Sequence, residues 1–219
     1  MSKYKAFLFD YDGTVVDSNI LILHSWQCVA DKYIPGRHFD VEYLIKGFGR
    51  PLYDCMVETL RDYGIDADVD EAVDVYRSYQ ASHPEEYAEL YPGIKEFLIG
   101  IKEKNLKAGI VTSRNTKSLI AGLKMLGVYE YFDELVTCDD TTIHKPDPTP
   151  ALICCKKLGV DPSDAIMLGD SVHDIACGNN AGSDSAFVKW SFCTKIEDFP
   201  EDNKPTYYIE EGKDLLKLL

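Results

Sequence analysis

Two carboxylates, Asp10 and Asp12, directly follow the short apolar run Ala6–Phe9. The run has the length and composition of a buried strand, and a buried parallel strand ends at the edge of the sheet where ligands bind. Acids at that position are placed for chemistry, and their hard oxygen atoms suit Mg²⁺. Gly13 permits a sharp turn there, and Thr14 can cap the segment after the turn. An ordinary Asp-Gly turn after a strand explains these residues equally well, so the rest of the chain must decide.

A hydroxyl pair follows a second apolar run. Thr112 and Ser113 come directly after Ala108–Val111 and lead into a predicted helix. The first backbone N–H groups of a helix have no partner within it, so this junction predicts an anion site. An ordinary helix cap is the simpler interpretation of the same two residues.

Charged residues mark two further junctions. Lys145 precedes a proline, which favours an extended backbone and makes the lysine part of a rigid segment. Asp170 and Asp174 lie four residues apart where the apolar run 166–168 passes into a predicted helix. A surface lysine and a helix cap would account for these residues one at a time, but not for the whole set.

The four stretches gain meaning together because each lies at the carboxyl end of a predicted strand, and such ends meet at one edge of a parallel sheet. Asp10, Asp12 and Asp170 would supply oxygen ligands for Mg²⁺. Thr112 and Lys145 would supply a hydroxyl and a fixed positive charge. Carboxylates, magnesium, a lysine and a free helix N-terminus together describe a site for phosphoryl transfer.

The elements that must position these residues fall into two unlike blocks. From Asp17 to about Tyr91 each periodic segment is helical: 20–33, 41–46, 52–63 and 69–81. From Ile94 onward, helices alternate with short apolar runs: 108–111, 135–136, 165–168, 185–188 and, before a closing helix, 207–209. This alternation predicts an α/β fold with a Rossmann-like three-layer core and a mostly parallel sheet. We predict a core of residues 1–16 and 92–219, with an all-helical cap, residues 17–91, inserted after the first strand.

Composition narrows the classes of partner. The 219 residues are 45% hydrophobic, enough for a real core, and no apolar run approaches the ~18 residues of a membrane-spanning helix. A net charge of −14 argues against a nucleic-acid partner, whose phosphates need a basic surface. Seven cysteines without a C-x-x-C pair are typical of reduced thiols, and with no signal peptide apparent we expect a cytoplasmic protein. Nothing in the sequence distinguishes a monomer from a homodimer.

The four stretches resemble, in order and spacing, the four motifs of the haloacid dehalogenase superfamily, over residues 7 to about 188. The segments 9–18 and 168–171 carry most of this resemblance, and the helical insert resembles the cap of the phosphoglycolate phosphatase-like branch. The resemblance implies an Mg²⁺-dependent phosphoric monoester hydrolase. Its substrate would be a small phosphorylated metabolite, cleaved through an aspartyl-phosphate intermediate.

The resemblance also implies a role for each matching residue. Asp10 would be the nucleophile and Asp12 the general acid and base. Thr112, Ser113 and Lys145 would bind the transferring phosphoryl group. The metal would be held by the side chains of Asp10 and Asp170 and by the backbone carbonyl of Asp12, with Asp174 in support of the metal site and of Lys145. Dehalogenases and phosphonate-cleaving members lack an acid at the second position, so the presence of Asp12 here argues against both chemistries.

Specificity should lie in the cap. The loop 47–52 joins two cap helices, and the resemblance implies that it reaches over the active site; Arg50 is the candidate for binding a second anionic group of the substrate. His144 and Asp147 stand where the family more often has small residues. We expect Asp147 to face solvent or cap the helix near Pro148, and we expect no catalytic role for His144 or His173. His24, on the first cap helix, could face the site.

Three functions remain open. The first is the phosphatase just described, with inorganic pyrophosphate among its possible substrates. The second is a phosphosugar mutase of the β-phosphoglucomutase type; such relatives use a cap lysine, and residues 47–94 contain none. The third is a non-catalytic module that binds phosphorylated metabolites, which intact catalytic groups argue against.

Overall fold

The sheet places the acidic residues after its central strands. A computed structural model describes residues 2–83 and 89–219, and within them six strands form one sheet in the order β3-β2-β1-β4-β5-β6. Every neighbouring pair is parallel. Phe9 at the end of β1 lies opposite Ile110 in β2 and Leu168 in β4, so the segments after these three strands leave the sheet at the same level. The strands are β1 (Ala6–Phe9), β2 (Lys107–Val111), β3 (Glu134–Val136), β4 (Ala165–Gly169), β5 (Asp184–Val188) and β6 (Tyr207–Ile209).

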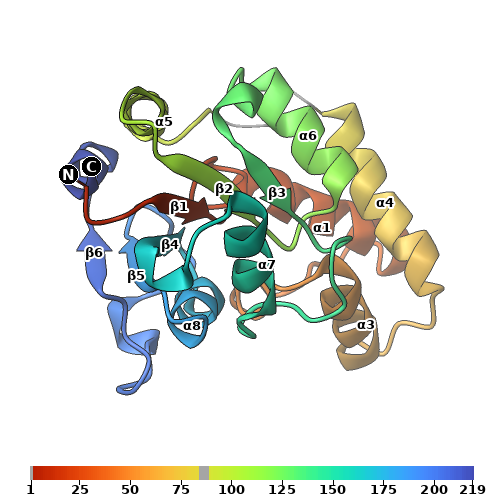
Figure 1. The fold of residues 1–219 in the computed structure, drawn as a ribbon. Coiled ribbons are helices and arrows are strands. Elements are labelled where there is room, and N and C mark those ends of the chain that lie inside the picture. Colours follow the sequence, from red (N-terminus) through yellow and green to blue (C-terminus); the bar gives the residue numbers. More distant parts are fainter. Residues whose placement is uncertain (1, 84–88) are drawn as a thin grey trace.

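Helices cover both faces of the sheet, as Figure 1 shows. Successive side chains of a strand point to opposite faces, and all four residues of β1 are buried. Phe7 and Phe9 pack toward α5 (Ile94–Glu103), α6 (Thr116–Met125) and the 3-10 helix η5 (Gly212–Leu218). Ala6 and Leu8 pack toward α7 (Thr149–Leu158) and α8 (Val172–Asn180). The predicted α/β class and three-layer core are therefore confirmed.

A second apolar core lies among the helices that follow β1. These helices are α1 (Asn19–Tyr33), α2 (Val41–Ile45), α3 (Leu52–Asp62) and α4 (Val69–Ser82). Trp26, Met56 and Tyr76 are buried between them, with the Trp26 and Tyr76 rings edge to face at 5.5 Å. The chain passes between the two cores where Val16 pairs antiparallel with Leu90. This crossing supports the boundaries at residues 16 and 92, and we propose the helical unit as the cap.

The end of the chain differs in detail from the expected closing helix. Residues 212–218 form a 3-10 helix rather than an α-helix, and Leu215 within it is fully buried. Runs of 3-10 helix are mostly short, so these seven residues form a long one. Gly212 lies so close to Pro92 that a Cβ atom there would fall 1.8 Å from the Pro92 carbonyl oxygen. Within the described residues, 3-10 turns also occur at η2 (Tyr129–Tyr131), η3 (Pro162–Asp164) and η4 (Ile196–Asp198).

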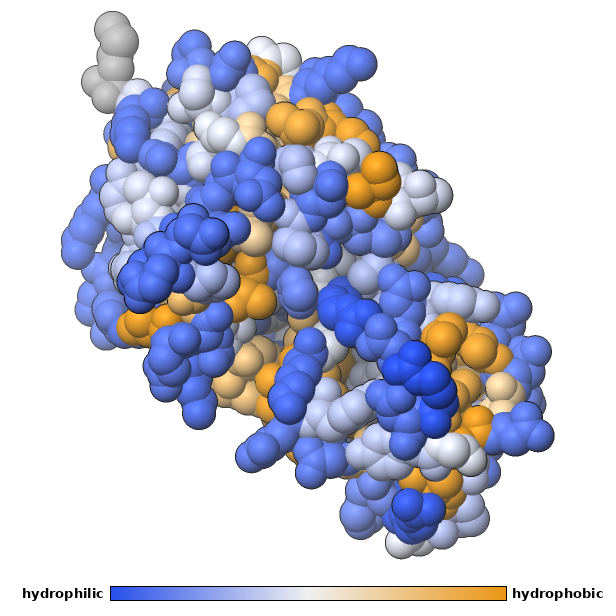
Figure 2. All heavy atoms as spheres, turned by 90° about the horizontal axis from the view of Figure 1, so that it is seen from below, coloured by the Kyte–Doolittle hydropathy of each residue, from blue (hydrophilic) through white to orange (hydrophobic). Residues whose placement is uncertain are grey.

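The surface has no large apolar patch on the face that Figure 2 shows. The face seen in Figure 2 is mostly hydrophilic, and its apolar residues form separate groups rather than one continuous patch. All seven cysteines are free thiols, and Cys154 and Cys155 are buried as core residues of α7. Of the helices in the described part of the chain, none has the length and apolarity needed to cross a membrane.

Candidate active site

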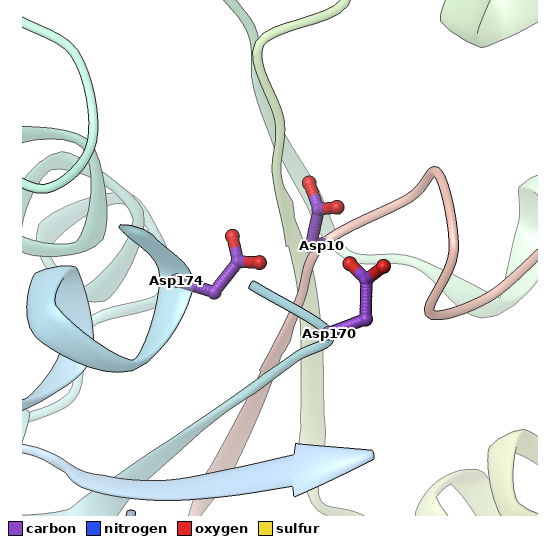
Figure 3. Close-up of side chains that lie close together, drawn as sticks. All are labelled: Asp10, Asp170 and Asp174. Atoms are coloured by element: carbon purple, nitrogen blue, oxygen red, sulfur yellow. The ribbon is translucent and has the colours of Figure 1, made fainter. Parts of the chain in front are cut away.

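Three buried carboxylates meet at the carboxyl edge of the sheet. Asp10 follows β1, Asp170 follows β4 and Asp174 lies in the first turn of α8, and Figure 3 shows their carboxyl groups turned toward a shared space. One oxygen from each lies within 4.8 Å of the others. All three side chains are almost completely buried. The sheet topology thus brings Asp10 together with two acids that are 160 or more positions away in the sequence.

Two glycines make this close approach possible. Gly13 has a φ of +78°, a conformation that residues with a side chain rarely adopt, and a Cβ atom there would lie 2.2 Å from an Asp170 oxygen. Gly169 packs against Asp174, and a Cβ atom added to this glycine would lie 2.1 Å from the Cβ atom of Asp174. Thr14 does not cap a helix as expected: its buried hydroxyl is 3.5 Å from Asp170 Oδ1 instead.

Lys145 is buried among the acids. Its Nζ donates to Asp10 Oδ1 at 2.8 Å, to Asp174 Oδ1 at 2.6 Å and to the carbonyl of Val111 at 3.2 Å. Burial alone would lower the pKa of the Lys145 ammonium, but the two carboxylates outweigh it and hold this pKa above its ordinary value. The lysine is therefore a permanent positive charge beside Asp10. Asp147, two residues after Lys145, is exposed, as expected, and accepts hydrogen bonds from the backbone N–H and the hydroxyl of Thr149.

The oxygens of Asp174 are already engaged. Oδ1 accepts from Lys145, while Oδ2 accepts from the hydroxyl of Ser171 at 2.6 Å and from its backbone N–H at 3.1 Å, which closes a capping box at the start of α8. Asp174 thus orients Lys145 and rigidifies the turn that carries Asp170. This arrangement supports the predicted supporting role.

One lysine cannot neutralise three buried carboxylates. Burial holds the pKa of Asp10 well above its ordinary value although Lys145 acts in the opposite direction, and burial together with Asp174 raises the pKa of Asp170 to about 7. Excess negative charge and hard oxygen donors are what a divalent cation such as Mg²⁺ requires. The donor set fits the expected ion, which the side chains of Asp10 and Asp170 and the carbonyl of Asp12 would hold.

The pKa of Asp170 leads to a prediction about metal and pH. Because the folded-state pKa is raised, ionisation of Asp170 costs stability as the pH rises from about 4 through 7 without metal. Mg²⁺ binds the ionised site and should remove this cost. Saturating Mg²⁺, at about 100 times its Kd, should raise the melting temperature by about 5–10 °C at pH 8 and by less at pH 6. Thermal melts in EDTA and in MgCl₂ test this, and Asp170→Asn should remove most of the difference.

Asp12 is held by an arginine that the sequence interpretation did not assign to the site. Arg114 donates from Nη2 to Asp12 Oδ1 at 2.6 Å and from Nε to Oδ2 at 2.9 Å, and Ser18 donates to the same carboxylate. Burial would raise the pKa of Asp12, but the guanidinium outweighs it and holds this pKa below its ordinary value. Arg114 follows the Thr112–Ser113 pair at the end of β2. Its position directly after a strand is the sequence feature that could have identified it as a site residue.

At the start of α6, the prediction of free backbone N–H groups for an anion is wrong for two of these groups. The N–H of Thr116 donates to Asp139 at 2.8 Å, and the N–H of Ser118 donates to the Asn115 side chain at 2.9 Å. These two groups therefore already have acceptors. Thr112 stays beside the acids and accepts from the N–H of Arg114 at 3.2 Å. Ser113 donates its hydroxyl to the carbonyl of Gly49 at 2.6 Å and so joins the core to the cap loop.

Arg50 lies in that loop but is engaged by another acid. Its two terminal nitrogens donate to the two carboxylate oxygens of Glu58 in α3, each at 2.7 Å. The hydrogen-bonded Glu58 raises the pKa of the guanidinium further. Binding of a substrate anion by Arg50 stays a prediction, and it would require competition with Glu58.

A cavity of about 420 Å³ joins these groups beneath the cap. Asp10, Asp12, Thr112, Ser113 and Asp170 line it from the core, whereas Arg50, Arg77 and Gln80 line it from the cap. Lys46 also lines it, one residue before the interval in which the sequence showed no cap lysine. The argument against a mutase from the missing lysine is therefore wrong.

The histidines differ in their positions. His144 lines the cavity. His173 lies at the start of α8, where burial lowers the pKa of its imidazole. His24 is exposed, lies against Tyr79 in α4 and does not line the cavity, so the possibility that it faces the site is not realised.

Comparisons with known proteins agree with this geometry. The chain is 37% identical over 217 residues to a protein named pyrophosphatase PpaX from Bacillus velezensis, and the match covers 99% of this chain and 96% of that protein. The crystal structure of a predicted phosphoglycolate phosphatase from Haemophilus somnus has a TM-score of 0.82 at 24% identity and covers 100% and 99% of the two chains. The structure of β-phosphoglucomutase from Clostridium difficile has the same TM-score at 23% identity, covering 97% and 93%. Residues 7–188 match the family profile described as haloacid dehalogenase-like hydrolase, and the chain belongs to this family.

Proposed function

We propose that this protein is an Mg²⁺-dependent phosphohydrolase that works through an aspartyl-phosphate intermediate, and that its substrate is inorganic pyrophosphate. The observation that carries the chemistry is the buried contact of Lys145 with Asp10 beside Asp170, at a cavity beneath the cap. The name of the relative from Bacillus velezensis supports pyrophosphate as the substrate. A cavity of about 420 Å³ is at the small end of the range for ligand pockets, in keeping with a compact substrate.

In this mechanism Asp10 attacks phosphorus with its carboxylate oxygen, and the bond from phosphorus to the leaving oxygen breaks. Asp12, protonated at this stage, gives its proton to the leaving oxygen and is left ionised. Lys145 neutralises the approaching negative charges. Water then attacks the aspartyl phosphate, while Asp12 accepts the proton of that water and Asp10 leaves as a carboxylate. When bound, Mg²⁺ would supply further neutralisation of charge on the transferring group.

The mutase is the second candidate, since Lys46 lines the cavity and a β-phosphoglucomutase shares the fold. A panel of phosphorylated compounds separates the two functions. The panel should include pyrophosphate, phosphoglycolate, p-nitrophenyl phosphate and β-glucose 1-phosphate, with phosphate release and isomerised sugar both measured. We expect the highest kcat/KM for pyrophosphate, by about tenfold or more over the others. Conversion of the sugar phosphate without phosphate release would identify a mutase instead.

The role of Asp12 has its own test. Asp12→Ala should slow formation of the aspartyl phosphate by about 10²–10⁴-fold for an alkyl phosphate, whose leaving oxygen needs a proton, and much less for p-nitrophenyl phosphate. Rapid-quench measurements of the first turnover with both esters provide the comparison. An equal loss with both leaving groups would contradict proton transfer from Asp12.

A further inference from the structure

Gly49, in the loop that joins α2 to α3, contacts two separate loops of the core. Its carbonyl oxygen accepts a hydrogen bond of 2.6 Å from the hydroxyl of Ser113, in the segment after β2. A Cβ atom added to Gly49 would lie 2.9 Å from Ser171 Oγ and 3.7 Å from His173 Cδ2, so the loop also packs against the turn after β4. Gly49 has a φ of +83°, which residues with a side chain rarely adopt. A side chain at this position would therefore strain the backbone and push the loop away from the core.

The hydroxyl of Ser113 is already used by this contact. A hydroxyl group has a single proton to donate, and Ser113 donates it to the carbonyl of Gly49. The lone pairs that remain on Oγ are acceptors, and acceptors do not bind the oxygen atoms of an ionised phosphoryl group. The side chain of Ser113 therefore suits the contact with the cap better than the phosphate-binding role that the family resemblance implies.

The contact lies beside groups that are expected to act in the reaction. Ser113 directly follows Thr112, which lines the cavity. Ser171 donates its hydroxyl to Asp174, which in turn accepts from the active-site lysine. The cap loop is thus held against the two core segments that carry these active-site residues.

The hydrogen bond exists only while the cap rests on the core. Ser113 belongs to the core and Gly49 to the cap, and the two residues lie 64 positions apart in the sequence. The chain crosses between the two units at Val16 and Leu90, which take no part in this contact. Rotation of the cap about that crossing would keep the chain connections and break the hydrogen bond.

We propose that Ser113 is a positioning residue: its hydroxyl holds the cap closed over the active site by binding the Gly49 carbonyl, and it does not bind the phosphoryl group. The inference rests on the proposed phosphohydrolase and adds the step that closes its site. Loss of this hydrogen bond lowers the fraction of the protein in the closed form, and the apparent affinity for every substrate falls by the same factor. One hydrogen bond between neutral groups changes such an equilibrium by about fivefold.

The kinetics of variants at Ser113 test this role. Ser113→Ala should raise KM by about fivefold for both pyrophosphate and p-nitrophenyl phosphate, with kcat within about twofold of the wild type. Ser113→Thr keeps the hydroxyl and should restore KM to within about twofold of the wild type. A fall in kcat of about tenfold or more with KM unchanged in Ser113→Ala would identify a phosphoryl ligand that acts in the transition state, and would overturn the proposal.

Substitution of Gly49 gives a second test that leaves Ser113 in place. Gly49→Ala puts a Cβ atom against Ser171 and should raise KM for both substrates by about tenfold or more. Gly64→Ala is the matched control, because Gly64 also lies in the cap with a φ of +64°, but nothing lies within 4 Å of a Cβ atom added there. Both substitutions strain a left-handed backbone, so the control should keep KM within about twofold of the wild type. Equal KM values for the two alanine variants would contradict a role for the contact of Gly49 with the core.

Hydrogen exchange separates this inference from the proposed function, because it needs no turnover. Amide exchange of the peptide that covers residues 47–52 should be about fivefold faster in Ser113→Ala than in the wild type, while exchange of the peptide from α1 stays unchanged. Unchanged exchange in the loop would overturn the role of Ser113. A wild type that releases no phosphate from any substrate would refute the proposed function, and the exchange rates would still decide whether Ser113 holds the cap.

Discussion

Asp10→Asn is expected to reduce turnover of p-nitrophenyl phosphate in Mg²⁺ by about 10⁴-fold or more while the protein stays folded. An amide is a poor nucleophile, so the covalent route is lost and cannot be replaced by a neighbouring acid. The fold should survive because a buried carboxylate with a raised pKa is replaced by a neutral group of the same shape, and Lys145 keeps Asp174 as its partner. Steady-state phosphate release and thermal melts provide the two readouts.

The intermediate offers a direct check of the same variant. Acid-quenched wild-type enzyme should carry one phosphoryl group on the peptide that contains Asp10, and Asp10→Asn should carry none when analysed by mass spectrometry. Asp147→Asn is the matched control, since it makes the same change at an exposed acid near the active-site lysine. Retained turnover in Asp10→Asn, or a labelled peptide elsewhere, would contradict the nucleophile assignment.

Lys145→Met should destabilise the protein as well as inactivate it. The substitution leaves Asp10 and Asp174 buried without their shared ammonium group, and loss of one partner of a buried ion pair costs about 3–5 kcal/mol of unfolding free energy. The loss should be smaller at pH 5, because burial raises the pKa of Asp10 and so favours the neutral form of that abandoned carboxyl group, and Mg²⁺ should recover part of it. Urea unfolding in EDTA and in MgCl₂ at both pH values measures these effects.

A surface lysine gives the matched control. Lys157 pairs with Asp140 at 3.0 Å, with side chains that are 36% and 29% exposed. Lys157→Met should cost less than about 1 kcal/mol, because solvent screens exposed pairs. If the two variants unfold at the same urea concentration in EDTA, the buried contact of Lys145 does not stabilise the protein as the structure indicates.

Local sequence patterns accounted for most of the fold. The apolar run Ala6–Phe9 became β1, and the run predicted at 165–168 became β4 (Ala165–Gly169), because short apolar segments bounded by turn residues are readily buried as strands of a covered sheet. The predicted cap helices were found within two residues, as with the segment 69–81, which is α4 (Val69–Ser82). The closing segment was harder, since a short helix of seven residues carries too weak a period to separate 3-10 from α.

The residues that would bind the substrate were less accessible to the sequence. The N–H of Thr116 appeared free because its acceptor, Asp139, lies 23 residues away in another loop. Arg50 appeared available because its pairing with Glu58 depends on how the loop turns back onto α3. The sequence shows which hydrogen-bonding groups a residue carries, but not which partner in the folded protein already binds those groups.

The sequence by itself determined that Asp10, Asp12 and Asp170 would meet, because parallel strands direct their carboxyl ends to one edge wherever the segments between them run. Lys145 comes nine residues after β3 (Glu134–Val136), so the path of that loop in the tertiary structure decided its place beside Asp10. Only the tertiary structure decided that Asp12 would be paired with Arg114, 102 positions away, and that Gln80 of the cap would accept a hydrogen bond from the same arginine. Such contacts depend on side-chain direction and on the placement of the cap over the core. The positions of the strands follow from repeated local patterns, whereas the pairing of single charges across two units is set by packing.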